Sequence, residues 1–168
     1  MPGNVALLLD VETDSRLRSL QDLNALVRKA GGKLGSTLFY FEHCGRVVVE
    51  LGDRSEDEVM DAVIAEDGVL DFDVEAGEAT VWTDPAVTSR VAGVLKERCG
   101  VTAGVELMWR ARGDMGVALD SEAAARDLAA FLTSLQDFPE VTGSYINAVK
   151  GTVSEEMWDG VHENLIVP

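Results

Sequence analysis

The sequence predicts an α+β protein of two lobes, each built from antiparallel strands and helices. Three observations lead to this prediction. Runs of apolar or β-branched residues alternate with amphipathic helical segments along the chain. Glycines, prolines and helix-capping residues separate these runs at short intervals. No low-complexity linker divides the 168 residues, so one lobe is expected to be inserted into the other through short turns.

The first elements are predicted to be a strand and a helix. The nearly continuous apolar run Val5–Glu12 is typical of a buried strand. Ser19, with Asp22 three residues later, resembles a capping box, so the helix is expected to start at this serine. The helix should end at Gly31-Gly32, because glycine adopts the left-handed conformation of a helix C-terminus without steric cost.

Two hairpins are also predicted. Residues 36–42 and 46–51 are aromatic or β-branched runs on either side of His43-Cys44-Gly45, which is the pattern of a hairpin tip. The second hairpin lies later in the chain, with Ala76-Gly77 as its turn.

Three more helices are expected. Ser55 and Glu58 form a capping box before an apolar periodic run. Asp84-Pro85 is a typical helix start, because the aspartate can cap and proline lacks only an N–H that would have no helical partner there. Gly100 should end this helix, and the longest helix is expected at Ser121–Phe138.

The order of the elements gives the fold. Three more strands are expected, at residues 105–109, 115–119 and 141–149. The tail from Thr152 is unassigned, although its apolar residues could dock on the body. The full order of strands and helices is that of two nested ferredoxin-like (βαββαβ) units. The sequence therefore predicts an outer α+β lobe at residues 1–46 plus 111–168 and an inserted α+β lobe at residues 47–110.

Charge is distributed unevenly along the chain. The net charge of −16 disfavours unaided binding to nucleic acid. Residues 1–46 carry six basic and five acidic groups, however, so the remainder nets −17. Any contact with a polyanion is expected in this first third. No apolar run is long enough to span a membrane, and two distant cysteines favour a reducing, intracellular compartment over a disulfide framework.

Several segments resemble a known family. Thr13-Asp-Ser-Arg-Leu-Arg18 precedes the first helix, and Ala30-Gly-Gly-Lys-Leu-Gly35 follows it before an aromatic run. Together with Leu135–Val141 and Tyr145-Ile-Asn147, these segments resemble the second and third domains of the YebC family. The similarity covers most of residues 4–150. The family's basic N-terminal helical domain is expected to be missing, the loop after Gly35 is tighter, and the closing Asp-Asp is replaced by a Pro-Glu pair.

The resemblance implies a non-enzymatic regulator of gene expression that needs no cofactor. Bacterial members of that family are described as DNA-binding regulators or as translation factors. Mitochondrial members look like activators of the translation of cytochrome c oxidase subunit I. We therefore expect a ribosome-associated translational activator in the mitochondrial matrix, with the bacterial cytoplasm as the alternative. Its partner would be the ribosome, ribosomal RNA or mRNA, and DNA only through the missing basic domain. No membrane or small-molecule substrate is expected.

Two alternatives stay open. A YebC-type transcriptional regulator would bind duplex DNA with a steep salt dependence. An ACT-like regulatory module, also built on βαββαβ units, would bind a small molecule between paired subunits and gain thermal stability from it.

The candidate site for nucleic acid or the ribosome is the basic part of the first third. It comprises Arg16, Arg18, Arg28, Lys29 and Lys33 with the glycines Gly31, Gly32 and Gly35. Backbone N–H groups of a glycine-rich loop can approach a phosphate closely, and the basic side chains would supply charge. The competing interpretation is a helix C-cap followed by a tight turn.

Other chemistry is less well supported by the sequence. Asp71, Asp73 and Glu75 alternate along a strand, which favours a solvated acidic face over a metal site. His43-Cys44 lacks further zinc ligands at suitable spacing, so no metal is expected. Phe39 and Phe41 would share one strand face, which favours the core over RNA stacking. No acid, base or nucleophile constellation emerges, so no catalytic residue and no enzyme are predicted.

Overall fold

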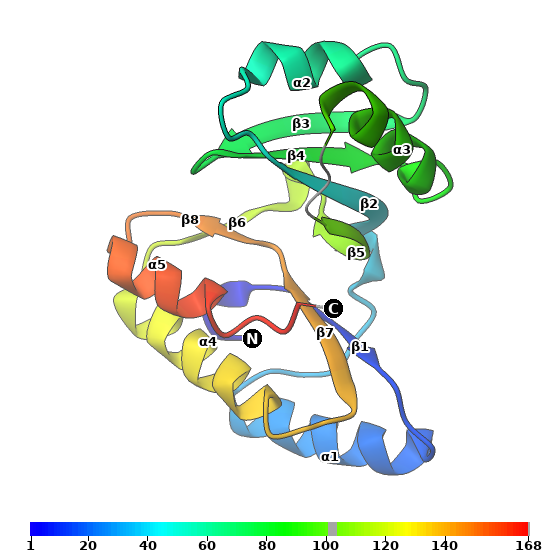
Figure 1. Ribbon diagram of the computed structural model, residues 1–168. Helices are drawn as coiled ribbons and strands as arrows, with labels where there is room; N and C mark the ends of the chain where they lie inside the picture. Colours follow the sequence, from blue (N-terminus) through cyan, green and yellow to red (C-terminus); the bar gives the residue numbers. More distant parts are fainter. Residues whose placement is uncertain (101–103, 168) are drawn as a thin grey trace. The chain divides into compact units, whose positions relative to one another are not determined.

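A computed structural model describes residues 1–100 and 104–167 and divides the chain into two compact units (Figure 1). The first unit combines Met1–Glu42 with Arg110–Pro168, and the second is His43–Trp109. The predicted mixed α+β fold with antiparallel sheets is confirmed. Among the helices of the described residues, none combines the length and apolar character that crossing a bilayer requires.

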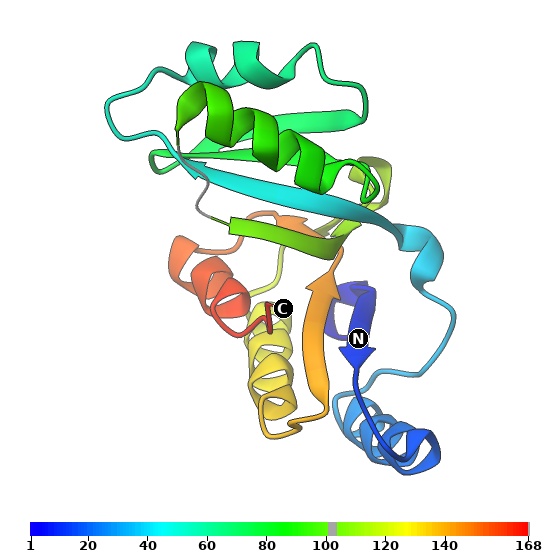
Figure 2. The same cartoon turned by 45° about the vertical axis from the view of Figure 1, so that its right-hand side comes forward.

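The second unit has ferredoxin-like topology. Its elements are β2 (Phe41–Glu50), α2 (Glu56–Val63), β3 (Val69–Glu75), β4 (Glu78–Thr83), α3 (Thr88–Cys99) and β5 (Gly104–Ala111), of which β2 begins and β5 ends two residues beyond the unit's bounds. The sheet order β3-β4-β2-β5 places the first and third strands of the unit at its centre. Both helices lie on the same side of the sheet (Figures 1 and 2). They bury Val47, Val81, Val91 and Leu95 completely.

Local signals set several boundaries of this unit as predicted. Ser55 caps α2 in a reciprocal capping box, in which the Glu58 N–H donates to Ser55 Oγ at 3.3 Å. Ala76 and Gly77 have φ values of 52° and 86° and form the turn between β3 and β4. Gly100 ends α3 in the left-handed conformation, with φ at 79°. Each of these signals depends on residues within one turn of one another.

The predicted hairpin at His43-Cys44-Gly45 is wrong, because β2 runs without interruption through these residues. Gly45 pairs with Thr83 of β4. A Cβ atom built on Gly45 would lie only 1.9 Å from Thr88 Oγ1 and 2.5 Å from Thr83 Oγ1. The glycine is therefore present because α3 approaches β2 too closely for any side chain.

Two helices begin at residues other than those predicted. Helix α1 (Arg16–Lys29) starts after Ser15, and Ser19 lies inside it as a buried residue. Helix α3 starts at Thr88 and not at Asp84-Pro85, because the aspartate folds a turn in which its Oδ1 accepts the Ala86 N–H at 2.8 Å. Side chains such as Asp and Ser that hydrogen-bond to the nearby backbone favour both turns and helix N-caps. The sequence alone therefore does not show which of these two structures they form.

The first unit packs its strands and helices around α4. Its other elements are β1 (Leu7–Val11), β6 (Val117–Leu119), α4 (Glu122–Leu135), β7 (Val141–Ile146), β8 (Ala148–Lys150) and α5 (Glu155–His162). Strands β1 and β7 pair antiparallel, whereas β6 and β8 form a short parallel pair that the sequence did not predict. Leu128, Leu132 and Leu135 of α4 are fully buried. The unassigned tail forms α5, whose Val161 is buried in the same core.

Asn147 divides the predicted strand 141–149 into β7 and β8. Its side chain accepts the Ala6 N–H and donates to the Met115 carbonyl, both at 2.7 Å. The residue is 1% exposed and its bond to Ala6 is buried, so water cannot replace that bond. Asn147 thereby ties the chain before β1 to the chain before β6.

Candidate nucleic-acid interface on the first unit

Helix α1 and the loop after it carry all of the predicted basic residues, but at two separate ends. Arg16 and Arg18 lie in the first turn of α1, and Arg28 and Lys29 lie in its last. Arg16 and Arg28 are therefore about 18 Å apart along the helix axis, at 1.5 Å per residue. The structure does not bring the two groups together as a single patch.

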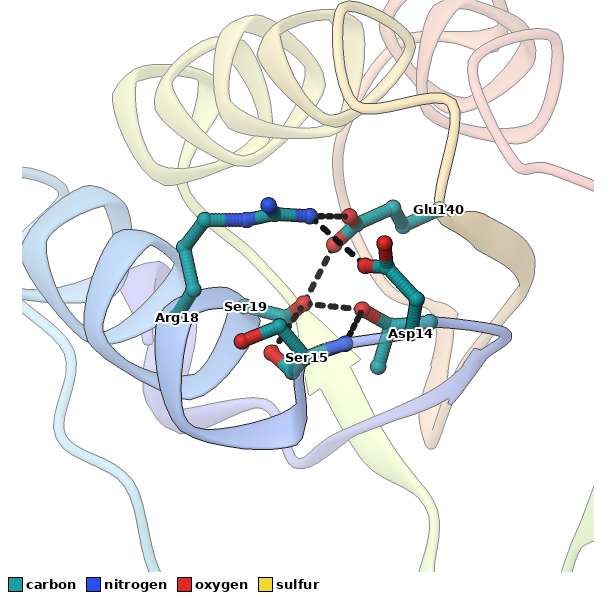
Figure 3. A network of polar contacts seen from close by, with 6 residues as sticks. Asp14, Ser15, Arg18, Ser19 and Glu140 are labelled. Carbon is teal, nitrogen blue, oxygen red and sulfur yellow. Dashed lines mark hydrogen bonds and ion pairs between the residues drawn. The ribbon is translucent and has the colours of Figure 1, made fainter.

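The first of these ends is engaged in a polar network within the chain (Figure 3). Arg18 Nη2 lies 2.7 Å from Glu140 Oε1 and 3.0 Å from Asp14 Oδ1. Ser19 Oγ donates to the other oxygen of Glu140 and also lies 2.7 Å from Thr13 Oγ1. Two carboxylates thus face one guanidinium, so Arg18 offers little uncompensated charge to an outside anion.

The contacts within the network also shift the pKa values of Glu140 and Arg18. Hydrogen bonds from Ser19 and Arg18 lower the pKa of the Glu140 carboxyl below its ordinary value. The hydrogen bond to Glu140 and the charge of Asp14 raise the pKa of Arg18. Glu140 was not predicted as a site residue, because its partners lie more than a hundred positions away in the sequence.

Replacing Glu140 with glutamine should reduce stability at neutral pH, and the deficit should vanish in acid. The folded state holds the pKa of Glu140 below that of the unfolded chain, so folding favours the deprotonated form. This contribution is complete above the unfolded pKa, near 4.5, and is lost as pH falls through the lower folded pKa. Urea unfolding of wild type and E140Q across this range measures it.

The matched control for E140Q is Glu163→Gln, which changes an exposed residue after α5. E163Q should unfold at the wild-type urea concentration throughout the pH series. A deficit of E140Q that stayed constant from neutral pH to strong acid would show that the Glu140 charge has no part in the network.

The second end of α1 closes in a Schellman motif. The Gly32 N–H donates to the Val27 carbonyl at 2.9 Å, and the Gly31 N–H donates to the Arg28 carbonyl at 3.0 Å. Gly31 has a φ of 75°, as this motif requires. These two N–H groups are therefore used inside the chain, and a phosphate contact at this end would fall to side chains.

Three basic side chains are exposed at this end, which we call the basic end of α1. They are Arg28, Lys29 and Lys33. Lys33 lines a groove of about 400 Å³ between β1, α1 and residues 33–40. The other lining residues are mainly apolar, among them Leu7, Leu9, Leu20, Leu34 and Tyr40.

An exposed aromatic side chain adjoins this groove. Phe39 is 56% exposed and stacks on Tyr40, with ring centroids 4.0 Å apart. The expectation that Phe39 and Phe41 share a core-facing side is wrong for Phe39, because Leu38–Tyr40 form a 3-10 turn before β2 begins. Phe41 alone is buried.

The remaining candidates do not form a reactive site within the described residues. Asp71, Asp73 and Glu75 are exposed on β3, and Asp73 accepts a hydrogen bond from Trp82 Nε1 at 2.8 Å. His43 stacks on Trp109 with ring centroids 4.8 Å apart, while Cys44 beside it is buried. In residues 1–100 and 104–167, no three His, Cys, Asp or Glu side chains gather as metal ligands would.

Comparison with known proteins decides the family. A family model that describes the second and third domains of TACO1/YebC proteins matches residues 1–148. The chain belongs to the TACO1/YebC family. The predicted resemblance is thus confirmed. The contact of Glu140 with Arg18 and Ser19 joins the two segments that carry it, Thr13–Arg18 and Leu135–Val141.

Two relatives and one solved structure are informative. A probable transcriptional regulatory protein of Saccharomyces cerevisiae is 30% identical over 166 residues, covering 88% of this chain and 57% of the relative. One of the same name in Thiobacillus denitrificans is 32% identical over 152 residues, covering 88% and 61%. The crystal structure of a conserved hypothetical protein from Aquifex aeolicus has a TM-score of 0.73 at 25% identity, covering 89% and 62%. This TACO1/YebC chain therefore spans about three fifths of each.

Proposed function

We propose that this TACO1/YebC chain is a non-enzymatic regulator of gene expression that binds the ribosome and activates translation. The observation that carries the proposal is the basic end of α1, where Arg28, Lys29 and Lys33 are exposed. The groove that Lys33 lines also includes Tyr40, on which the exposed ring of Phe39 stacks. Single-stranded or looped RNA is bound by basic side chains, which pair with its phosphates, and by exposed aromatic rings, which stack on its bases. The compartment we propose is the mitochondrial matrix, or the cytoplasm in a bacterium.

The uneven charge of the chain supports a partner that combines RNA with protein. A net charge of −16 opposes close approach to a bare polyanion over the whole surface. A ribosome offers ribosomal RNA to the basic end of α1 and basic proteins to the acidic remainder. A single nucleic-acid molecule could satisfy only the first of these.

Reversing the charge of the basic end should weaken ribosome binding by at least about tenfold. Each contact between a basic side chain and a phosphate releases counterions from the RNA, and this release favours binding. The variant is R28E/K29E/K33E, and the measurement is co-sedimentation with purified ribosomes over a protein titration. These side chains are exposed, so the fold should be kept. Phe39→Ala should weaken binding further without changing its salt dependence.

The matched control reverses two exposed bases elsewhere, Lys96 of α3 and Arg126 of α4. The K96E/R126E variant changes net charge in the same direction and should co-sediment nearly as wild type does. If both variants lose binding equally, only the overall charge matters and the basic end of α1 is not the interface.

A second candidate function is regulation of transcription through duplex DNA. The names of the yeast and Thiobacillus relatives favour it. Against it, the basic residues of α1 form two separated groups, and Arg18 of the first group is compensated by Asp14 and Glu140. Under this alternative, duplex DNA would bind with high affinity and a steep dependence on salt.

A further inference from the structure

The ferredoxin-like sheet of the second unit has two edge strands, β3 and β5. β3 carries acidic side chains at three alternate positions, and its pairing with β4 shifts register between Val69 and Asp71. Charges and bulges of this kind keep an edge strand from pairing with another chain. The β3 edge is therefore protected.

The other edge, β5, exposes apolar side chains instead. Val105 is 48% exposed and Leu107 is 51% exposed. Side chains alternate along a strand, so Val105, Leu107 and Trp109 lie on one face. Two half-exposed aliphatic side chains on an edge strand favour pairing with a further strand that would cover them.

The charges of β5 are complementary to those of a second β5 strand. Glu106 and Arg110 lie on the face opposite Leu107, on either side of Met108. When two β5 strands pair antiparallel about Met108, Glu106 of each faces Arg110 of the other, and Leu107 faces Trp109. A two-fold axis makes each contact twice. Pairing about Leu107 would instead set Glu106 against Met108.

Glu106 has one ion pair within its own chain. Its Oε2 atom lies 3.5 Å from Arg46 Nη1 and accepts no hydrogen bond from the described residues. The Glu106 side chain is 32% exposed, so part of it is open to a partner from outside the chain. Arginine has five N–H donors, so Arg110 of a second copy can pair with this side chain alongside its contacts within its own chain.

We propose that β5 pairs antiparallel with β5 of a second copy of this chain, about a two-fold axis at Met108. The pairing joins two four-stranded sheets into one and covers Val105 and Leu107 on both copies. It is independent of ribosome binding, because the basic end of α1 belongs to the other unit.

Sedimentation velocity of the 168-residue chain over a range of concentrations tests the proposal. Wild type should form a dimer. Leu107→Lys should raise the dimer dissociation constant at least about tenfold, because it places like charges at the pairing edge. The matched control is Leu70→Lys on β3, which is 54% exposed and should leave dimerisation unchanged.

Mixing two charge variants tests the register. Glu106→Arg and Arg110→Glu should each dimerise at least about tenfold more weakly alone than wild type, because like charges then face each other. Mixed together, the two variants should associate more tightly than either does alone, since every cross-strand pair is again of opposite sign. The arginine introduced at 106 also faces Arg46, but this repulsion is present in both separate and mixed samples.

Circular dichroism establishes that each variant is folded. The proposal is overturned if wild type stays monomeric at every concentration, or if L70K weakens dimerisation as much as L107K does. It is also overturned if the mixture of E106R and R110E associates no more tightly than the separate variants.

Discussion

Replacing Gly45 with valine should destabilise the second unit by about 3 kcal/mol, from overpacking and a broken buried hydrogen bond. The new Cβ alone would lie 1.9 Å from Thr88 Oγ1 and 2.5 Å from both Thr88 Cγ2 and Thr83 Oγ1. Thr83 and Thr88 are 0% and 2% exposed, and their hydroxyls hydrogen-bond to each other at 2.9 Å. To admit the side chain, α3 must move away from β2 and break this bond. Urea unfolding followed by circular dichroism measures the loss.

Gly93→Ala is the matched control for the Gly45 variant. Gly93 lies on the exposed side of α3, and a Cβ there would meet no atom within 4 Å. Alanine should stabilise the helix at this position by about 0.5–1 kcal/mol, because glycine loses more backbone entropy on folding. A Gly45 variant as stable as wild type would mean that β2 and α3 do not approach as described.

Asn147→Ala should destabilise the first unit by about 3 kcal/mol, because it leaves the buried Ala6 N–H and the partly buried Met115 carbonyl without their partner. The Ala6 N–H and the Met115 carbonyl each bond to this side chain at 2.7 Å, and Asn147 itself is 1% exposed. Native-state hydrogen exchange should show the largest loss of protection in β1 and β7, which meet beside Asn147.

Asn164→Ala provides the control for Asn147. Asn164 also makes two side-chain hydrogen bonds, to Thr133 and to the Gly160 carbonyl, but it is only partly buried. Water can replace these bonds, so the loss should stay below about 1 kcal/mol. Equal losses for the two asparagines would contradict the role assigned to burial.

The parts of the fold that were predictable from the sequence depend on neighbouring residues. The capping box of Ser55 and Glu58, the turn at Ala76-Gly77 and the left-handed Gly100 each act within a few positions. The chain's hydrophobic pattern likewise predicted most strands and helices, because one buried face repeats with the period of the element.

The parts that were missed depend on residues distant in the sequence. Gly45 has the composition of a turn, and only the approach of Thr88 shows that it is a packing glycine. Glu140 reaches Ser19 across 121 positions, which no local pattern reveals. The same holds for the candidate interface: its basic residues were predictable, but the compensation of Arg18 by Glu140 was not. Phe39 was placed in the core because a 3-10 turn was read as a strand.

The central claim is that this TACO1/YebC chain engages RNA of the ribosome through the basic end of α1. Its most direct test is equilibrium binding of the wild-type chain to purified ribosomes and to duplex DNA, side by side over a salt series. We expect saturable ribosome binding that R28E/K29E/K33E weakens, and weak binding to DNA. Tight DNA binding with a steep salt slope, together with no binding to ribosomes, would contradict the account.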